Sequence, residues 1–148
     1  MKKCRLTVTA LCLSALMLFS PTVMKAENPF MAPYGTPFNM PPFDKISNSD
    51  YLPAFEEGIR QHNQEIEAII NNRAVADFDN TIAALDNAGQ LLENVTYVFN
   101  GLYDACSTPE LQTLGEQILP MLSKHNDEVM MNERLFSRVK QVYDNRKK

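Results

Sequence analysis

The sequence has few of the residues from which catalytic and metal sites are usually built. Its 148 residues include two histidines and three cysteines. They contain no His-Glu-x-x-His, no Gly-x-Ser-x-Gly, no phosphate-binding loop and no Cys-x-x-Cys. These absences exclude a gluzincin-type zinc site, a nucleophile elbow, a P-loop and a thioredoxin-like dithiol within this sequence. Composition and spacing alone therefore indicate a helical domain without visible catalytic machinery.

Basic residues are also scarce once the N-terminus is set apart. Lysine and arginine number 14 against 18 acidic residues, and four of the basic residues precede residue 27. The remaining 10 basic and 18 acidic residues give a net charge of −8 over residues 27–148. Nucleic acids and anionic membrane surfaces bind clustered lysine and arginine, so neither is an expected partner. The length of 148 residues also excludes a second large domain.

Residues 1–26 have the pattern of an export signal peptide. A basic start is followed by an apolar stretch over residues 6–19, then by Pro21 and by Ala26 as the expected cleavage position. This stretch of about 14 residues is shorter than the ~20 that a membrane-spanning helix needs. An uncleaved anchor is the alternative, whereas the bulky Leu11 disfavours lipidation of Cys12. We expect an exported protein, periplasmic or secreted, that is free of the membrane after cleavage.

Cleavage of the signal would leave Cys106 as the single cysteine of the mature chain. One cysteine cannot form an internal disulfide, so the fold must be held together by packing. The neighbouring residues Asp104 and Ala105 provide neither a base nor a positive charge that would lower the thiol pKa. We therefore expect Cys106 to be a small, partly buried apolar residue rather than a nucleophile.

Residues 27–46 combine proline with aromatic residues. Five of the nine prolines lie here, interspersed with Phe30, Tyr34, Phe38 and Phe43. Such proline density excludes an α-helix and favours an extended path, and the aromatic residues distinguish the segment from a flexible linker. We expect an extended arm whose rings lie on another surface. The protein's own helices are the favoured surface, and a binding partner is the alternative.

Residues 47–148 show helical spacing of apolar residues and no useful strand alternation, so the predicted class is all-α with about four amphipathic helices. Ser47 and Asp50 resemble a capping box, Pro53 is expected in the first turn, and Asn71-Asn72 ends the first helix. The stripe of this helix consists of Leu52, Phe55, Ile59, His62, Ile66, Ile69 and Ile70.

Three further helices are predicted after residue 78. The second starts near Asp79 or Asn80 and reaches Cys106, and Gly89 either splits it or allows a close helix crossing. Residues 107–110, Ser-Thr-Pro-Glu, have a hydroxyl cap and a first-turn proline at the start of the third, which Pro120 is expected to kink. Asn132 is the expected cap of the fourth.

The two histidines are each followed three residues later by a carboxylate. His62 with Glu65 and His125 with Glu128 could share a helix face, so a metal-carboxylate bundle is conceivable. The order is reversed relative to the Glu-x-x-His of dimetal helical bundles, and we favour amphipathic residues at helix borders. Asn94-Val95-Thr96 matches a glycosylation sequon, a pattern that is common by chance.

Several stretches give the sequence a family resemblance. They are Asn28-Pro29-Phe30 with Pro41-Pro42-Phe43-Asp44-Lys45-Ile46, then Asp50-Tyr51-Leu52-Pro53-Ala54-Phe55-Glu56-Glu57-Gly58, and then Phe78-Asp79-Asn80-Thr81-Ile82-Ala83-Ala84-Leu85. The likeness continues to Asn132-Glu133-Arg134-Leu135-Phe136-Ser137-Arg138-Val139-Lys140. Together they resemble the N-terminal region of bacterial peptidyl-dipeptidases, in the zinc-dependent family of oligopeptidase A and thimet oligopeptidase.

The resemblance implies a helical peptidase that releases dipeptides from peptide C-termini. Its N-terminal helices would form one wall and the roof of a channel that admits short peptides. Zinc and the His-Glu-x-x-His motif would lie several hundred residues beyond this sequence, so no catalytic, cofactor-binding or metal-ligating residue is assigned in residues 1–148. The implied partners are a missing catalytic domain, in cis or as a separate chain, and short peptides. The alternative is an exported, non-catalytic binding module that uses the aromatic arm at 28–43.

Overall fold

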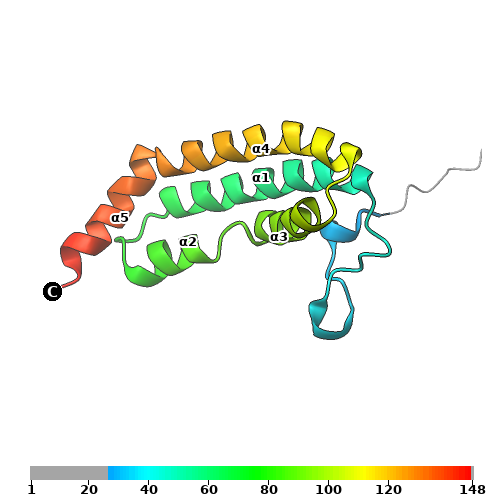
Figure 1. Cartoon of the computed structure of the whole chain (residues 1–148). Helices are drawn as coiled ribbons and strands as arrows, with labels where there is room; N and C mark the ends of the chain where they lie inside the picture. Colours follow the sequence, from blue (N-terminus) through cyan, green and yellow to red (C-terminus); the bar gives the residue numbers. More distant parts are fainter. Residues whose placement is uncertain (1–26, 148) are drawn as a thin grey trace, which may run out of the picture.

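The computed structural model describes residues 27–147, and the predicted export signal at 1–26 lies outside them. The described residues form an all-α fold without a strand, which confirms the predicted class. Four longer helices dominate it (Figure 1): α1 (Asn48–Ile70), α3 (Gln90–Ala105), α4 (Pro109–Met130) and α5 (Glu133–Asn145). The shorter elements are the 3-10 turns η1 (Pro29–Met31) and η2 (Pro37–Asn39), the π-helical η3 (Phe78–Ala83), and α2 (Ala84–Asp86).

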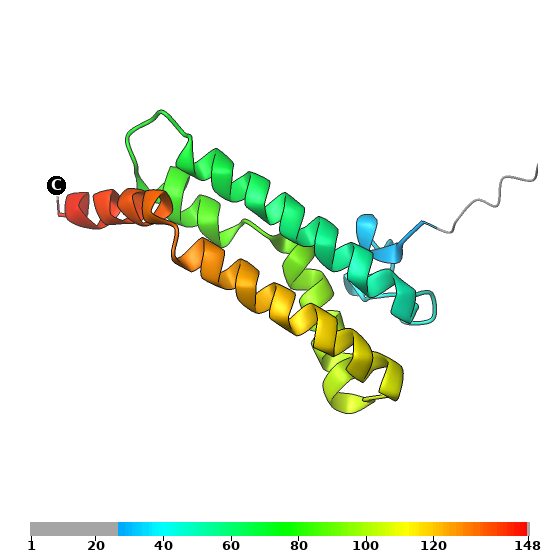
Figure 2. The ribbon, with the colours of Figure 1, turned by 90° about the horizontal axis from the view of Figure 1, so that it is seen from above.

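Helix α1 is the central element of the fold. It packs against both α3 and α4, and Figure 2 shows α1 and α4 lying side by side along most of their length. The end of α4 turns into α5, which lies at the opposite end of the molecule from the arm (Figures 1 and 2). None of the helices between residues 27 and 147 is long and apolar enough to cross a membrane.

The start of α1 agrees with the predicted capping box. The Asp50 carboxylate accepts hydrogen bonds from the Ser47 backbone N at 2.8 Å and from the Ser47 hydroxyl at 2.7 Å. The helix ends at Asn71, as predicted. The prediction that Pro53 lies in the first turn is wrong. Because Asn48 is the first helical residue, Pro53 falls in the second turn and leaves one helical carbonyl without its donor.

Gly89 splits the second predicted helix. Its φ of 78° is left-handed, a conformation that glycine adopts at little cost, and it separates α2 from α3. Before it, the Asp77 carboxylate accepts from the Asn80 backbone N at 2.8 Å and starts η3. After it, α3 ends at Ala105. Of the two roles that the sequence left open for Gly89, the structure shows the split.

The predicted caps of the last two helices are also present. The Thr108 hydroxyl accepts from the Leu111 backbone N at 3.3 Å, and α4 then continues as one helix through Pro120. At the start of α5, the Asn132 side chain accepts from the backbone N atoms of two residues of the first turn, at 3.1 and 3.0 Å. Local polar side chains therefore fix where both helices begin.

The main core is a cluster of aromatic rings between α1 and α3. Phe55 and Phe99 are fully buried with centroids 5.6 Å apart and ring planes at 88°, and Tyr51 meets Phe99 edge-on at 5.3 Å. Edge-on pairs of this kind add about 0.5–1.5 kcal/mol each beyond burial of their area. The two helices cross closely at Gly58, where an added Cβ would lie 2.9 Å from the Leu92 Cα.

A second, smaller cluster attaches α5 to the end of α1. It consists of Ile66, Ile69, Ile70 and Leu135, and Arg138 lies beside it with only 8% of its surface exposed. The Arg138 guanidinium donates to the Asn72 carbonyl at 2.7 Å, to the Asn80 side-chain oxygen at 2.8 Å and to the Thr81 hydroxyl at 3.3 Å. One buried arginine therefore joins α5 to η3 and to the residue Asn72 just after α1.

The arm over residues 27–46 divides its aromatic residues between the core and the surface. Phe30 is buried, and its ring centroid lies 5.4 Å from that of Tyr51. Tyr34 packs against the same core, so both rings lie on the protein's own helices, as favoured from the sequence. Phe38 is 99% exposed, so its ring does not lie on the protein's own helices, and Phe43 is half exposed. No α-helix occurs in the arm, although two short 3-10 turns interrupt its extended path.

Candidate functional site

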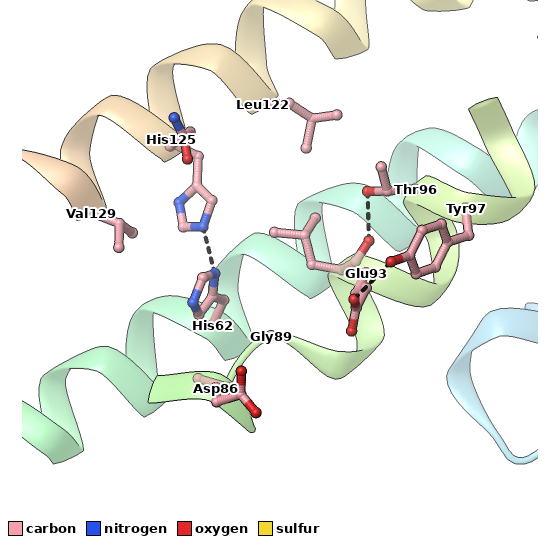
Figure 3. Close-up of a pocket in the computed structure, with 12 residues that line it drawn as sticks. His62, Asp86, Gly89, Glu93, Thr96, Tyr97, Leu122, His125 and Val129 are labelled. Carbon is pink, nitrogen blue, oxygen red and sulfur yellow. Dashed lines mark hydrogen bonds between the residues drawn. The ribbon is translucent and has the colours of Figure 1, made fainter. Parts of the chain in front are cut away.

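The two histidines meet across the groove between α1 and α4. His62 Nδ1 and His125 Nε2 are 2.9 Å apart, although 63 residues separate them in sequence. Figure 3 shows the two rings pointing toward one another from their helices, with centroids 5.0 Å apart and planes at 69°. A single hydrogen bond between two imidazoles requires that at least one of them is neutral.

Burial decides which ring donates this hydrogen bond. His125 is 5% exposed, and its other nitrogen, Nδ1, is buried without a hydrogen-bond partner. If Nδ1 carried the proton, a buried N–H would be orphaned, which is rarer in proteins than an unpaired acceptor. We therefore assign the proton to His125 Nε2, which donates to His62 Nδ1.

The surroundings of the pair favour neutral rings. Burial lowers the pKa of His62, and the nearby Glu65 carboxylate opposes this only in part. Burial also lowers the pKa of His125, and a charge on His62 would lower it further, against a smaller opposing effect of Glu128. Both rings are consequently less basic than a histidine in water.

Gly89 completes the packing around His62. An added Cβ at Gly89 would lie 3.1 Å from the imidazole Cγ and Nδ1, so only a residue without a side chain leaves the ring its space. The Glu65 carboxylate accepts a hydrogen bond from the Gly89 backbone N at 2.6 Å. This carboxylate therefore ties α1 to the left-handed turn that starts α3.

An open cleft of about 460 Å³ lies next to the histidine pair. Two exposed carboxylates, Asp86 and Glu93, stand along it, and the Tyr97 hydroxyl donates to Glu93 at 3.1 Å (Figure 3). Apolar side chains complete its lining: Leu92, Leu122 and Val129. No lysine or arginine lines the cleft, so its charge is negative.

The arrangement does not form the metal site that the histidine–carboxylate spacing allowed. The structure brings the two histidines together, but the Glu65 carboxylate is engaged by Gly89 and the Glu128 carboxylate lies 3.6 Å from Lys124 Nζ. Across residues 27–147, no group of three or more histidine, cysteine, aspartate or glutamate side chains could hold a metal ion. The donor set described here therefore does not fit zinc, and we derive no metal-dependent step from it.

The other two candidates from the sequence lie apart from this cleft or have structural roles. The expectation of a partly buried Cys106 is wrong: Cys106 is exposed, and α3 ends one residue earlier, at Ala105. In the sequon at Asn94, the middle residue Val95 is fully buried. The Thr96 hydroxyl donates to the Leu92 carbonyl at 2.6 Å, one helical turn back.

The pairing of His62 with His125 and the role of Arg138 were not foreseen from the sequence. Each histidine occupies an apolar stripe of its own helix, a signal that both rings face the interior. The spacing does not predict how α1 and α4 are aligned along their axes, and therefore does not predict that the two histidines meet. Arg138 had no signal of this kind, because an arginine at a stripe border is usually exposed.

Comparison with known proteins places this geometry in the context of peptidases. No protein-family model matches the chain. It is 42% identical over 123 residues to the dipeptidyl carboxypeptidase of Escherichia coli, which covers 83% of this chain. It is 41% identical over 121 residues to the protein of the same name from Salmonella typhimurium, covering 82% of this chain. Oligopeptidase A of Escherichia coli is 27% identical over 112 residues, or 76% of this chain and 16% of its own length.

These matches relate the chain to peptidases. More particularly, it belongs in sequence to the dipeptidyl carboxypeptidase family, as a segment of it, and this confirms the resemblance that the motif stretches indicate. The matched segment amounts to 18% of the length of each of the two dipeptidyl carboxypeptidases.

Proposed function

We propose that this chain is the helical, non-catalytic N-terminal part of an exported peptidase of the dipeptidyl carboxypeptidase type, where it forms part of the wall of the substrate channel. The observation that carries the proposal is the identity of 41–42% over 82–83% of the chain. At that identity, the helices, their caps and the ring cluster of the core are expected in the relatives as well.

The proposed activity belongs to the assembled peptidase and not to these residues alone. The names of the relatives imply release of dipeptides from the C-termini of peptides. The sequence has no His-Glu-x-x-His, and the paired histidines lack a third ligand in the described region. We therefore place zinc and the water-activating glutamate outside this chain. In the assembled peptidase, this chain would contact short peptides as part of the channel wall.

Export is proposed from the N-terminal pattern. The basic start, the short apolar stretch and Ala26 favour a cleaved signal peptide and a periplasmic location. Measuring the N-terminal residue of the protein recovered from the periplasm would test this. A chain that starts at or near Glu27 supports the proposal, and an intact Met1 in the cytoplasm contradicts it.

A chimera tests the channel-wall proposal. In the dipeptidyl carboxypeptidase of Escherichia coli, the 123 matched residues would be replaced by the matching residues of this chain. We expect the chimera to release dipeptides from a short peptide, while deletion of the segment abolishes release and this chain alone has no activity. A chimera that folds but does not cleave short peptides would contradict the proposal.

The exposed rings of the arm support one alternative, a binding module that uses residues 28–43. Phe38 is 99% exposed with φ at 56°, a conformation that is strained for a bulky residue and that nothing packed on its ring explains. A titration with short apolar peptides, followed by NMR, would show shifts confined to the arm that disappear in Phe38→Asp. Absence of shifts at the arm would dismiss this alternative.

A further inference from the structure

We infer that the outer face of α5 docks on the remainder of the peptidase, against an apolar surface bordered by acidic side chains. This inference rests on the proposed function. The α5 face is defined by Phe136, Val139 and Tyr143, spaced so that they form one stripe along the helix. Phe136 is 65% exposed and Tyr143 is 60% exposed, although both are large aromatic residues.

The described part of the chain leaves the α5 face uncovered. The neighbouring side of α5 supplies its buried contacts, through Leu135 and Arg138. In Figures 1 and 2, α5 extends past the ends of α1 and α4 at the tip of the molecule. Helices of soluble proteins normally bury one apolar stripe, whereas α5 has a second stripe beside the buried one.

A shallow groove next to the stripe offers room for an apolar side chain. It has a volume of about 230 Å³ and lies between α2, the end of α4 and α5. Its lining is mainly apolar: Leu85, Val129, Met130, Leu135, Phe136 and Val139. The adjoining Met130 is 75% exposed, which extends the apolar surface onto the end of α4.

Charge distinguishes this end of the molecule from the rest. Residues 27–148 have a net charge of −8, yet residues 134–148 contain six of their 10 lysines and arginines. Helical spacing places Lys140 beside the stripe, where it pairs with Asp144 at 2.6 Å. Arg146 and Lys147 directly follow α5, and the Arg146 guanidinium lies 3.5 Å from the centre of the Tyr143 ring. An apolar surface with carboxylates at its border therefore complements the α5 face.

The size of the face argues for a partner within the same polypeptide. A stable interface between separate proteins buries about 800 Å² per partner, more than a stripe of three side chains on a short helix can supply. Docking within one chain does not lose the translational and rotational freedom that separate partners lose. In the two dipeptidyl carboxypeptidases, 18% of the length matches this chain, so most of each protein lies outside the matched segment.

The test compares two substitutions in two settings. Phe136→Asp is made in the full chain, purified after export, and in the chimera described above; Phe38→Asp, at the opposite end of the molecule, is the matched control. In the full chain we expect no change of melting temperature from either, since both rings are exposed. In the chimera we expect Phe136→Asp to lower the melting temperature and to raise hydrogen exchange of the α5 amides about tenfold, while Phe38→Asp does neither.

The remaining outcomes distinguish failure of the docking from failure of the proposed function. An active chimera whose stability and exchange do not respond to Phe136→Asp contradicts the docking and leaves the proposed function intact. An inactive chimera whose α5 is nevertheless protected contradicts the proposed function and supports the docking. A full chain that dimerises, or that binds vesicles of anionic lipid, and loses this property in Phe136→Asp would assign the α5 face to a second copy or to a membrane.

Discussion

Replacing Arg138 with methionine should detach α5 from the rest of the described fold. Methionine keeps an unbranched apolar stem but removes the guanidinium that donates to Asn72, Asn80 and Thr81. The arginine is 8% exposed and its three acceptors are neutral. Hydrogen bonds from a charged donor contribute about 1.5–3 kcal/mol each, and desolvation of the guanidinium offsets part of the sum. We expect a net loss of about 3 kcal/mol in the free energy that holds α5 in place.

Arg134→Met is the matched control, since it makes the same chemical change one turn earlier in α5. The Arg134 side chain is 60% exposed, donates to the Asn71 side chain at 2.6 Å and lies 3.9 Å from Glu67. Exposed pairs of this kind contribute about 0–1 kcal/mol, so Arg134→Met should change the stability of α5 only slightly.

Hydrogen exchange of the α5 amides, with urea unfolding of the full chain, separates the two variants. Arg138→Met should raise exchange in α5 while α1 and α3 stay protected, because the ring cluster between them is untouched. Arg138→Lys should recover only part of the loss, since one ammonium group cannot span three acceptors as the planar guanidinium does. If Arg138→Met and Arg134→Met agree within about 0.5 kcal/mol, the assigned role of Arg138 is refuted.

Three further predictions concern the core, the histidine pair and the free thiol. Phe99→Ala should cost about 3–5 kcal/mol in urea unfolding, whereas Phe38→Ala should change stability by less than about 0.5 kcal/mol; equal effects would contradict the described core. Because burial lowers the pKa of His62 and His125, stability should be complete above their ordinary pKa of 6.5 and decrease as the pH falls below it. His125→Gln should flatten this dependence of the melting temperature on pH, and an unchanged slope would exclude the pair as its source. Mild oxidation should produce a disulfide-linked dimer through the exposed Cys106, visible on a non-reducing gel and absent in Cys106→Ser.

The sequence could predict the all-α class and the helix boundaries because both depend on neighbours within a few residues. Ser47 and Asp50, Thr108, and Asn132 each cap a helix through contacts no more than three residues away. Pro53 lies six residues after Ser47, so the correctly predicted start of α1 already places it in the second turn and not in the first.

The candidate site could not be predicted in the same way because its parts meet only after the helices pack. The bond between His62 and His125 joins residues 63 positions apart. It depends on how far α4 is shifted along α1, and a stripe of apolar residues leaves that shift undetermined. The exposure of Cys106 likewise depended on where α3 ends, which is one residue before the position that periodicity suggested.

The length of α1 fixes a minimum size for anything that touches both ends of the described fold. Its 23 residues form one helix, which at 1.5 Å per residue is about 35 Å long. The arm with Phe38 lies at one end of α1 and the α5 face lies at the other (Figure 1). A single body in contact with both must extend about 35 Å, roughly the length of a helix of more than 20 residues. A short peptide in a compact conformation can therefore reach one end at a time, while a body the size of a domain can bridge the two.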